Sequence, residues 1–358
     1  MKGWIRRCAA QALDIPGIAN ALVRDRKRLG IIFVLHRFED RATGVGGMPP
    51  AALRELLAGL RRKKIRLASL IELLEIARTP EPPPGPWVAF TLDDGYEDQV
   101  RVGLPIFQEF DVPATLFPIS GFVDGRLWPW WDRVEHLILG TDTPPSEAAR
   151  LAQLSGLPTP EVRGLSLDDD TGRCGLICHV MESLKAVSTE ERERALGILA
   201  SAYGITLPAS APPRYSAASW NDLRRWEQAG LHCGCHTDSH PILTWEPDAV
   251  VQREVERSWM RLRAELEAPL PILAFPNGRW DRDFGAREVA AAQRAGMLWG
   301  LSGDPGYLKA PEQQPIASHS INSRFRIPRC FLSGDRPPTL RLLSGLAPIP
   351  RRTLGGGG

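Results

Sequence analysis

Apolar, strand-like runs alternate with stretches of helical period along most of this chain, and this alternation most limits its possible folds. Apolar runs at 30–35, 87–92 and 231–235 are each followed by a helical pattern, as at 51–62 and 249–267. This order is typical of parallel α/β proteins, because a crossover helix must return the chain before the next parallel strand begins. The 358 residues are enough for one large α/β barrel or for two ordinary domains.

The pattern changes between about 128 and 215, where helical stretches such as 190–202 are separated by segments rich in Pro, Ser and Asp. We interpret this region as an insertion on a barrel and not as a second catalytic unit. The predicted organisation is therefore an amino-terminal segment at 1–29, a barrel with its insertion at 30–331, and a loose tail at 332–358.

Only the amino-terminal segment has a charge composition that suggests a binding partner. Lys and Arg exceed Asp and Glu by two, 44 against 42, so the overall charge does not suggest nucleic acid. Residues 1–28 hold seven Lys or Arg against two Asp, with apolar residues between them. This composition suits peripheral contact with an anionic membrane, and equally a basic helix packed on the domain. No run has the length of a spanning helix and no export signal is evident, so we expect a cytoplasmic protein, with peripheral contact at the inner membrane surface as the alternative.

The cysteines suggest neither a disulfide framework nor a structural zinc site. Six cysteines in a chain of this size are expected to be free thiols. Neither Cys174 and Cys178 nor Cys233 and Cys235 have the Cys-x-x-Cys spacing of a structural zinc site. We interpret Cys233 and Cys235 as small residues of a buried strand, with metal contact by Cys235 as the alternative.

Two adjacent carboxylates, Asp93 and Asp94, follow the apolar run at 87–92. Two ionised carboxylates at one strand end repel each other unless a bound cation neutralises one of them or the two groups have different roles. We predict that one Asp ligates a metal and that the other handles a proton; an ordinary Asp-Asp-Gly turn is the alternative. Downstream, His236 and His240 are four residues apart, which would place both on one face of a helical turn, within reach of one ion.

The candidate segments share a position along the barrel. His36, the Asp pair, His236 and Pro276-Asn277-Gly278 each lie just past a predicted strand. Carboxyl ends of parallel barrel strands meet at one face, where active sites lie. One Asp and two His would leave ligand positions open for water and substrate, as a catalytic metal site requires.

These segments resemble the motifs of the polysaccharide deacetylases, the NodB-homology proteins of carbohydrate esterase family 4. Thr91-Leu92-Asp93-Asp94-Gly95 is similar to the first motif, His236-Thr237-x-x-His240 to the second, and Phe275-Pro276-Asn277-Gly278 to the third. The likeness runs from about residue 30 to residue 331, and 325–329 resembles a common final strand. It implies a distorted (β/α)7 barrel with Asp93 as general base and Asp94, His236 and His240 as metal ligands.

The resemblance leaves two positions for the general acid. The usual acid His lies near the carboxyl end of the domain, where this chain offers His319 in a polar loop. His36 instead resembles the acid of the branch that includes biofilm poly-N-acetylglucosamine deacetylases, in which the His precedes the Asp-Asp motif. We predict His36; a hydrogen-bonded strand-end His is the alternative.

Two features depart from the family pattern. Position 274 is Ala, where the third motif usually has an Arg that orients the base, so Arg279, Arg37 or another Arg has to replace it. The later Asp/Trp motif that braces the acid is not evident. These gaps leave open a catalytically inactive barrel that binds a glycan or a partner protein.

The sequence predicts a metal-dependent hydrolase that removes an acetyl or other acyl group from an N-acylated amino sugar. A bound metal would polarise the amide carbonyl and activate a water, while Asp93 accepts the water proton and His36 protonates the leaving amine. We expect the oxyanion between the metal and the backbone N–H of Asn277, which follows Pro276. Zn²⁺ is the first expectation, and Fe²⁺, Co²⁺ and Ni²⁺ also suit these ligands.

The substrate is predicted only by class. Trp130, within Trp128-Pro129-Trp130-Trp131, is the candidate sugar-stacking residue, with packing of the insertion as the alternative. The expected absence of export favours a lipid-linked or nucleotide-linked glycan precursor over a mature polymer. An O-acetyl esterase with the same site is a further alternative.

Overall fold

The structure of the chain is a computed structural model that describes residues 29–79, 87–141, 170–309 and 324–332. The predictions for the basic segment 1–28, for His319 and for the tail from 333 lie outside the described residues. Among the described helices, none combines the length and the apolar character needed to cross a membrane.

The described strands are short, apart from two that run through the middle of the molecule. They are β1 (Leu29–Leu35), β2 (Arg66–Leu67), β3 (Trp87–Asp94), β4 (Ala114–Pro118), β5 (His232–Cys233), β6 (Ile272–Ala274), β7 (Trp299–Leu301), β8 (Leu308–Lys309) and β9 (Cys330–Phe331). β1 and β3 are apolar almost throughout and buried, as expected of parallel strands that are covered on both faces.

Parallel pairing closes these strands into a barrel. One sheet joins β5, β4, β3 and β1, and a second joins β6 to β7. Two isolated bridges connect the sheets: Cys235 pairs with Leu273, and Leu301 pairs with Ile327 in the segment that leads to β9. β9 then pairs with β1, which completes the ring. This closure confirms the predicted distorted (β/α)7 barrel.

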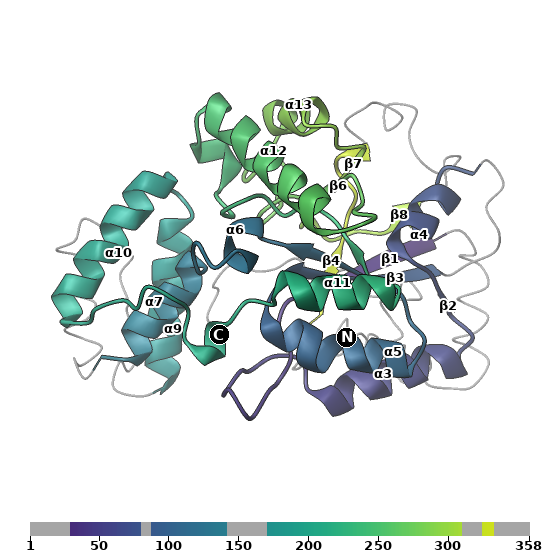
Figure 1. Cartoon of the computed structure of the whole chain (residues 1–358), viewed down its shortest axis with the longest axis horizontal. Helices are drawn as coiled ribbons and strands as arrows, with labels where there is room; N and C mark the ends of the chain where they lie inside the picture. The colour runs from purple at the N-terminus through teal and green to yellow at the C-terminus, as the bar shows by residue number, and fades with distance from the viewer. Residues whose placement is uncertain (1–28, 80–86, 142–169, 310–323, 333–358) are drawn as a thin grey trace, which may run out of the picture.

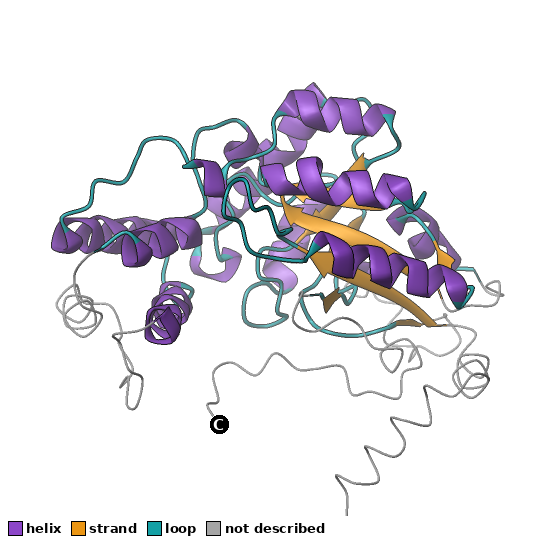
Figure 2. Cartoon of the chain, turned by 90° about the horizontal axis from the view of Figure 1, so that it is seen from below, coloured by secondary structure: helices purple, strands orange, loops and turns teal. Residues whose placement is uncertain are grey.

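Helices cover the barrel on two sides (Figures 1 and 2). They are α3 (Pro50–Arg62), α4 (Leu70–Ile76), the π-helical turn η1 (Gln99–Gly103), α5 (Leu104–Glu109), α6 (Ser120–Val123), α11 (Trp220–Gln228), α12 (Asp248–Glu265) and α13 (Ala286–Arg294), with the 3-10 turns η2 (Pro213–Tyr215) and η3 (Leu243–Trp245). In Figure 1, α3, α5 and α11 lie below the sheet, and α12 and α13 lie above it.

The sequence explains where these helices begin and which face they bury. In α3, Leu53, Leu57 and Leu60 recur at helical spacing and are buried against the barrel. Ser69 caps α4 in a reciprocal capping box with Glu72. Each cap satisfies backbone N–H groups that a helix leaves unpaired at its start.

Three helices of the predicted insertion are set apart from the sheet: α7 (Trp130–Leu139), α9 (Asp170–Leu184) and α10 (Thr189–Tyr203) (Figure 1). They bury an apolar cluster of their own, which includes Val134, Leu137, Leu176, Leu184, Leu196 and Leu199. The buried Arg192 donates to the carbonyls of Leu184 and Val187, between α9 and α10. The three helices therefore have a core separate from that of the barrel.

Candidate active site

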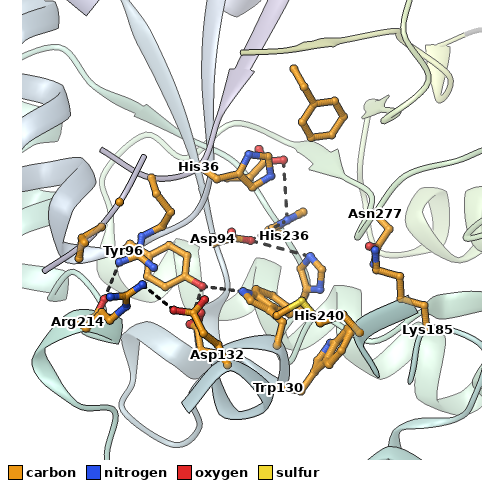
Figure 3. A pocket seen from close by; sticks show the side chains of 18 of the residues that line it. His36, Asp94, Tyr96, Trp130, Asp132, Lys185, Arg214, His236, His240 and Asn277 are labelled. Atoms are coloured by element: carbon orange, nitrogen blue, oxygen red, sulfur yellow. Dashed lines mark hydrogen bonds and ion pairs between the residues drawn. The ribbon is translucent and has the colours of Figure 1, made fainter. Parts of the chain in front are cut away.

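A pocket of about 480 Å³ lies between the carboxyl ends of the barrel strands and the insertion (Figure 3). The barrel side includes His36, Asp93, Asp94, His236, His240, Asn277 and Arg329, and the insertion side includes Trp130, Trp131, Asp132, Glu135, Met181 and Lys185. The structure thus brings together, around one pocket, the candidate residues that the sequence places far apart, with Pro276 buried next to Asn277.

Strand register sets the carboxylates beside the candidate acid. In the parallel pair of β1 and β3, Leu35 lies opposite Leu92, so His36 and Asp93 follow at the same edge. β3 extends through Asp94, which pairs with Pro118 of β4. The two Asp residues are therefore the last residues of the strand, where we expected them just beyond it.

Asp94, His236 and His240 form a group able to hold a metal ion. Asp94 Oδ1 lies 3.5 Å from His236 Nε2 and 3.9 Å from His240 Nε2. Their ligand atoms lie within 4.8 Å of one another, and all three side chains are buried. The Nδ1 of His236 lies 2.7 Å from the carbonyl of Ala274, an acceptor that leaves Nε2 free to face the group. The donor set and this orientation fit a divalent transition metal.

The predicted helical spacing of the two histidines is wrong. Residues 236–240 form a tight loop in which Thr237 and His240 have positive φ angles of 65° and 58°. The Thr237 hydroxyl accepts the backbone N–H of His240, and Glu254 of α12 accepts the N–H groups of Asp238 and Ser239. Side-chain and backbone hydrogen bonds therefore bring the two imidazoles together without a helix.

Burial and neighbouring charges give the three candidate ligands different proton affinities. Burial would raise the pKa of Asp94, but His236 and the neighbouring imidazoles outweigh it and lower that pKa to about 2. Burial, followed by the effect of His236, lowers the pKa of His240 to about 3. For His236, burial is outweighed by Asp93 and Asp94, which raise its pKa. Asp94 is thus ionised and His240 neutral near pH 7, as metal ligands must be.

Asp93 has a different partner from Asp94. Arg329 Nη1 lies 2.7 Å from Asp93 Oδ1, and Arg329 also donates to the carbonyl of Ser302. Burial would raise the pKa of Asp93, but the Arg329 guanidinium reverses the effect and holds that pKa below its ordinary value. Arg329 therefore supplies the guanidinium that is missing at Ala274.

The two other arginines that we considered have described partners other than Asp93. Arg37 pairs with Asp98 at 2.8 Å, and the backbone N–H of Arg279 donates to Asp283. One sequence feature pointed to Arg329, since the segment 325–329 resembles the family's final strand. Only the pairing of β9 with β1 shows that this segment reaches the base.

His36 faces the carboxylates across the pocket and stacks on Phe331 of β9, with ring centroids 5.4 Å apart. Burial lowers the pKa of His36, and the negative charges of Asp94 and Asp93 act against that effect. The buried amide of Gln99 donates to the backbone carbonyls of both His36 and Asp93. One side chain from η1, absent from our sequence prediction, therefore ties together the two strand ends that bear the candidate acid and base.

Asn277 and Trp130 both line the pocket, but the Trp130 ring is packed into the insertion. Asn277 lines the pocket with a positive φ of 55°, a strained backbone that is common at functional sites. Trp130 also lines it, but its ring is 4% exposed and lies under the Arg192 guanidinium within the insertion core. Little of that ring is available to stack on a sugar, whereas its neighbour Trp131 contacts His240 edge-on.

Comparison with known proteins places the chain in a family. A family model for polysaccharide deacetylases matches residues 81–153 and 192–297, half of the chain, and its gap falls in the insertion. Over 91 residues, the chain is 35% identical to the poly-beta-1,6-N-acetyl-D-glucosamine N-deacetylase of Escherichia coli K12. This alignment covers 25% of the chain and only 14% of that relative.

Solved structures show the same fold at low sequence identity. The deacetylase PplD of Streptococcus pyogenes, solved with acetate, superposes with a TM-score of 0.53 at 14% identity over 88% of this chain and 97% of PplD. IcaB of Ammonifex degensii superposes with a TM-score of 0.53 at 12% identity, with the same coverage of both chains.

The barrel and its paired carboxylates next to an Asp-His-His group define the class of NodB-type α/β-barrel proteins. The chain belongs to the polysaccharide deacetylase family, which confirms the resemblance found in the sequence.

Proposed function

We propose that this chain is a metal-dependent hydrolase that removes an N-acetyl or other acyl group from an amino sugar of a glycan or glycan precursor. The observation that carries the proposal is the separation of roles between two adjacent carboxylates. Asp94 faces His236 and His240, whereas Asp93 is held by Arg329. A site that bound glycan without hydrolysis would need neither the ligand group nor a charge-paired base.

Asp94, His236 and His240 would hold the metal, for which Zn²⁺ is the first candidate and Fe²⁺, Co²⁺ and Ni²⁺ are compatible. When bound there, a divalent cation supplies Lewis acidity toward the acyl carbonyl and lowers the pKa of a water. The Ala274 carbonyl already orients the His236 ring so that its Nε2 faces this group.

Asp93 would act as the general base through one particular oxygen. Its Oδ1 accepts from Arg329, while Oδ2 lies 3.9 Å from His236 Nε2, on the side of the ligand group. Because Arg329 keeps the carboxylate ionised, Oδ2 is available to accept the proton of the attacking water.

His36 would protonate the leaving amine. It lines the same pocket as the ligand group, and its stacking on Phe331 fixes the plane of the ring. The charges of Asp94 and Asp93 favour the protonated ring against burial. The backbone N–H of Asn277 would donate to the developing oxyanion, which the chain's bend after Pro276 supports.

The substrate proposal has two sources. The name of the Escherichia coli relative, a poly-N-acetylglucosamine N-deacetylase, supports an N-acetylated amino sugar. We further propose a lipid-linked or nucleotide-linked precursor as the physiological form, a cytoplasmic location, and peripheral membrane contact through residues 1–28. These further proposals come from the sequence alone.

Metal analysis followed by assays on two substrate types tests the function. We expect about one divalent metal bound per chain, and acetate release from chitooligosaccharides that is lost in Asp93→Asn. Release from acetylated xylan but not from chitooligosaccharides would show an O-acetyl esterase instead. Metal binding with no release from either substrate, while the sugars bind, would favour an inactive glycan-binding barrel.

A further inference from the structure

We propose that Trp131 and Asp132 of the insertion are positioning residues for the metal ligands, acting directly on His240 and, through Tyr96, on the strand end that bears Asp94. The inference rests on the proposed metal site and adds to it a role for the insertion. Figure 3 shows Tyr96, Asp132 and His240 among the residues that line the pocket, with a dashed line between the Tyr96 hydroxyl and Asp132.

The two histidine ligands are held in different ways. His236 Nδ1 has the Ala274 carbonyl as its partner, the usual arrangement by which a second contact fixes a ligating imidazole. His240 Nδ1 is buried and has no hydrogen-bond partner among the described residues. Packing must therefore orient the His240 ring.

Trp131 provides that packing contact. Its ring lies edge-on to His240, with centroids 4.6 Å apart and an interplanar angle of 67°. The indole itself is anchored, since its Nε1–H donates to the Tyr96 hydroxyl at 2.8 Å. A fixed indole restricts the rotation of the imidazole that it touches.

Tyr96 connects this contact to the first motif. It lies two residues after Asp94, is 1% exposed, and donates its hydroxyl to Asp132 Oδ2 at 2.7 Å. The Arg37 guanidinium covers its ring at 3.8 Å, and Arg37 is in turn held by Asp98. The Tyr96 hydroxyl thus both accepts from and donates to the insertion, and loss of either bond would leave a buried polar group unpaired.

The expected effect is on metal affinity. Loss of an outer contact to a metal ligand typically weakens binding about 10- to 100-fold. We expect Trp131→Ala to weaken Zn²⁺ binding within that range, measured by competition with a chromophoric chelator. Trp131→Phe removes one hydrogen bond and Tyr96→Phe removes two, and both variants keep a ring, so they should fold and give smaller losses that are not additive in the double variant.

The visible spectrum of the Co²⁺-loaded protein separates positioning from simple stability. A change in ligand orientation alters the Co²⁺ absorption bands, whereas a loss of stability elsewhere does not. The matched control is Trp128→Phe, because Trp128 is buried in the same segment and its described ring contacts are with His136 and Tyr215. We expect it to lower the melting temperature without changing Zn²⁺ affinity or the Co²⁺ spectrum.

Unchanged Zn²⁺ affinity and Co²⁺ spectra in folded Trp131→Phe, Tyr96→Phe and Asp132→Asn would overturn the proposal. These readouts do not depend on a substrate, so they distinguish its failure from a failure of the proposed deacetylase activity. Loss of Zn²⁺ affinity in these variants, in a protein that releases no acetate, would support the positioning role while contradicting the proposed function.

Discussion

Arg329 and Asp93 form a buried ion pair, 2.7 Å between Nη1 and Oδ1, with side chains 2% and 3% exposed. The residues are separated by 236 positions in the sequence. The pair compensates for Ala274, where the family usually has an arginine, by using the segment before β9. A guanidinium from the segment before β9 thus contacts Asp93 in place of one at position 274.

Removal of this guanidinium should shift the pH dependence of catalysis. Arg329 lowers the pKa of Asp93, so Arg329→Gln should raise it and move the acidic limb of the kcat/KM profile upward by about one to three pH units. Arg329→Lys keeps the positive charge and serves as the control, with a smaller shift. An acidic limb that stays in place in a folded Arg329→Gln protein would show that Asp93 is not the base.

The two adjacent carboxylates should respond differently to the same substitution. Asp94→Asn should lose the metal, because Asp94 is the one carboxylate that faces both histidines. Asp93→Asn should keep the metal and lose turnover by about two to four orders of magnitude, the usual effect of removing a positioned base. Elemental analysis of both purified variants checks this; equal metal loss would refute the division of roles.

His36 should control the basic limb of the profile. His36→Ala should fold and bind metal, lose about two to four orders of magnitude in turnover, and lose the basic limb, since that limb reports deprotonation of the acid. Burial lowers the pKa of His36. The basic limb of the wild-type profile should therefore lie at a lower pH than the limb that an exposed histidine would give. His319→Ala is the control, and the assignment is wrong if it alone shows this behaviour.

Asp132 should make the stability of the metal-free protein depend on pH. Burial raises the pKa of Asp132 to about 8, against about 4 in an unfolded chain. Its contribution is fully present below pH 4 and is lost as pH rises through 8, because the unfolded state releases the proton first. Between pH 4 and pH 8, the free energy of unfolding of Asp132→Asn should therefore fall less than that of wild type, by about a few kcal/mol. Urea titrations in the presence of a chelator measure this difference. Parallel curves for the two proteins would contradict this protonation state.

The basic segment 1–28 predicts a salt-dependent membrane contact. Each Lys or Arg near an anionic surface contributes about 1 kcal/mol, and salt screens that attraction beyond about 10 Å at 0.1 M. The 358-residue chain should co-sediment with anionic liposomes at low salt and dissociate as salt rises, whereas a chain that lacks residues 1–28 should not bind. Equal binding by both proteins would exclude the segment as the contact.

The sequence predicted the parts of this structure that depend on local pattern. The apolar runs at 30–35 and 87–92 form β1 and β3, and Cys233 and Cys235 are buried as interpreted. The loop at 236–240 could not be predicted, because the four-residue spacing suits a helical turn and a tight loop equally. Side chains such as Glu254, distant in sequence, decide between the two.

Contacts between distant segments account for the other differences. The pairing of Arg329 with Asp93 depends on the register of β9 against β1, and no periodicity encodes it. Among the tryptophans, the sequence does not show that Trp131 meets His240 while Trp130 packs into the insertion. Both outcomes depend on how the insertion lies against the barrel.

The pairing of β9 with β1 also sets an order of events during synthesis. The chain is synthesised from its amino terminus, at roughly 5 to 20 residues per second. His36, the carboxylates and both histidines leave the ribosome before Arg329, which precedes the last described strand. A nascent chain therefore carries Asp93, Asp94 and both histidines before it carries the guanidinium that pairs with Asp93. Asp93 acquires this partner only when β9 closes the ring of strands, so we expect a product truncated before residue 329 to contain every proposed metal ligand and still be a poor catalyst.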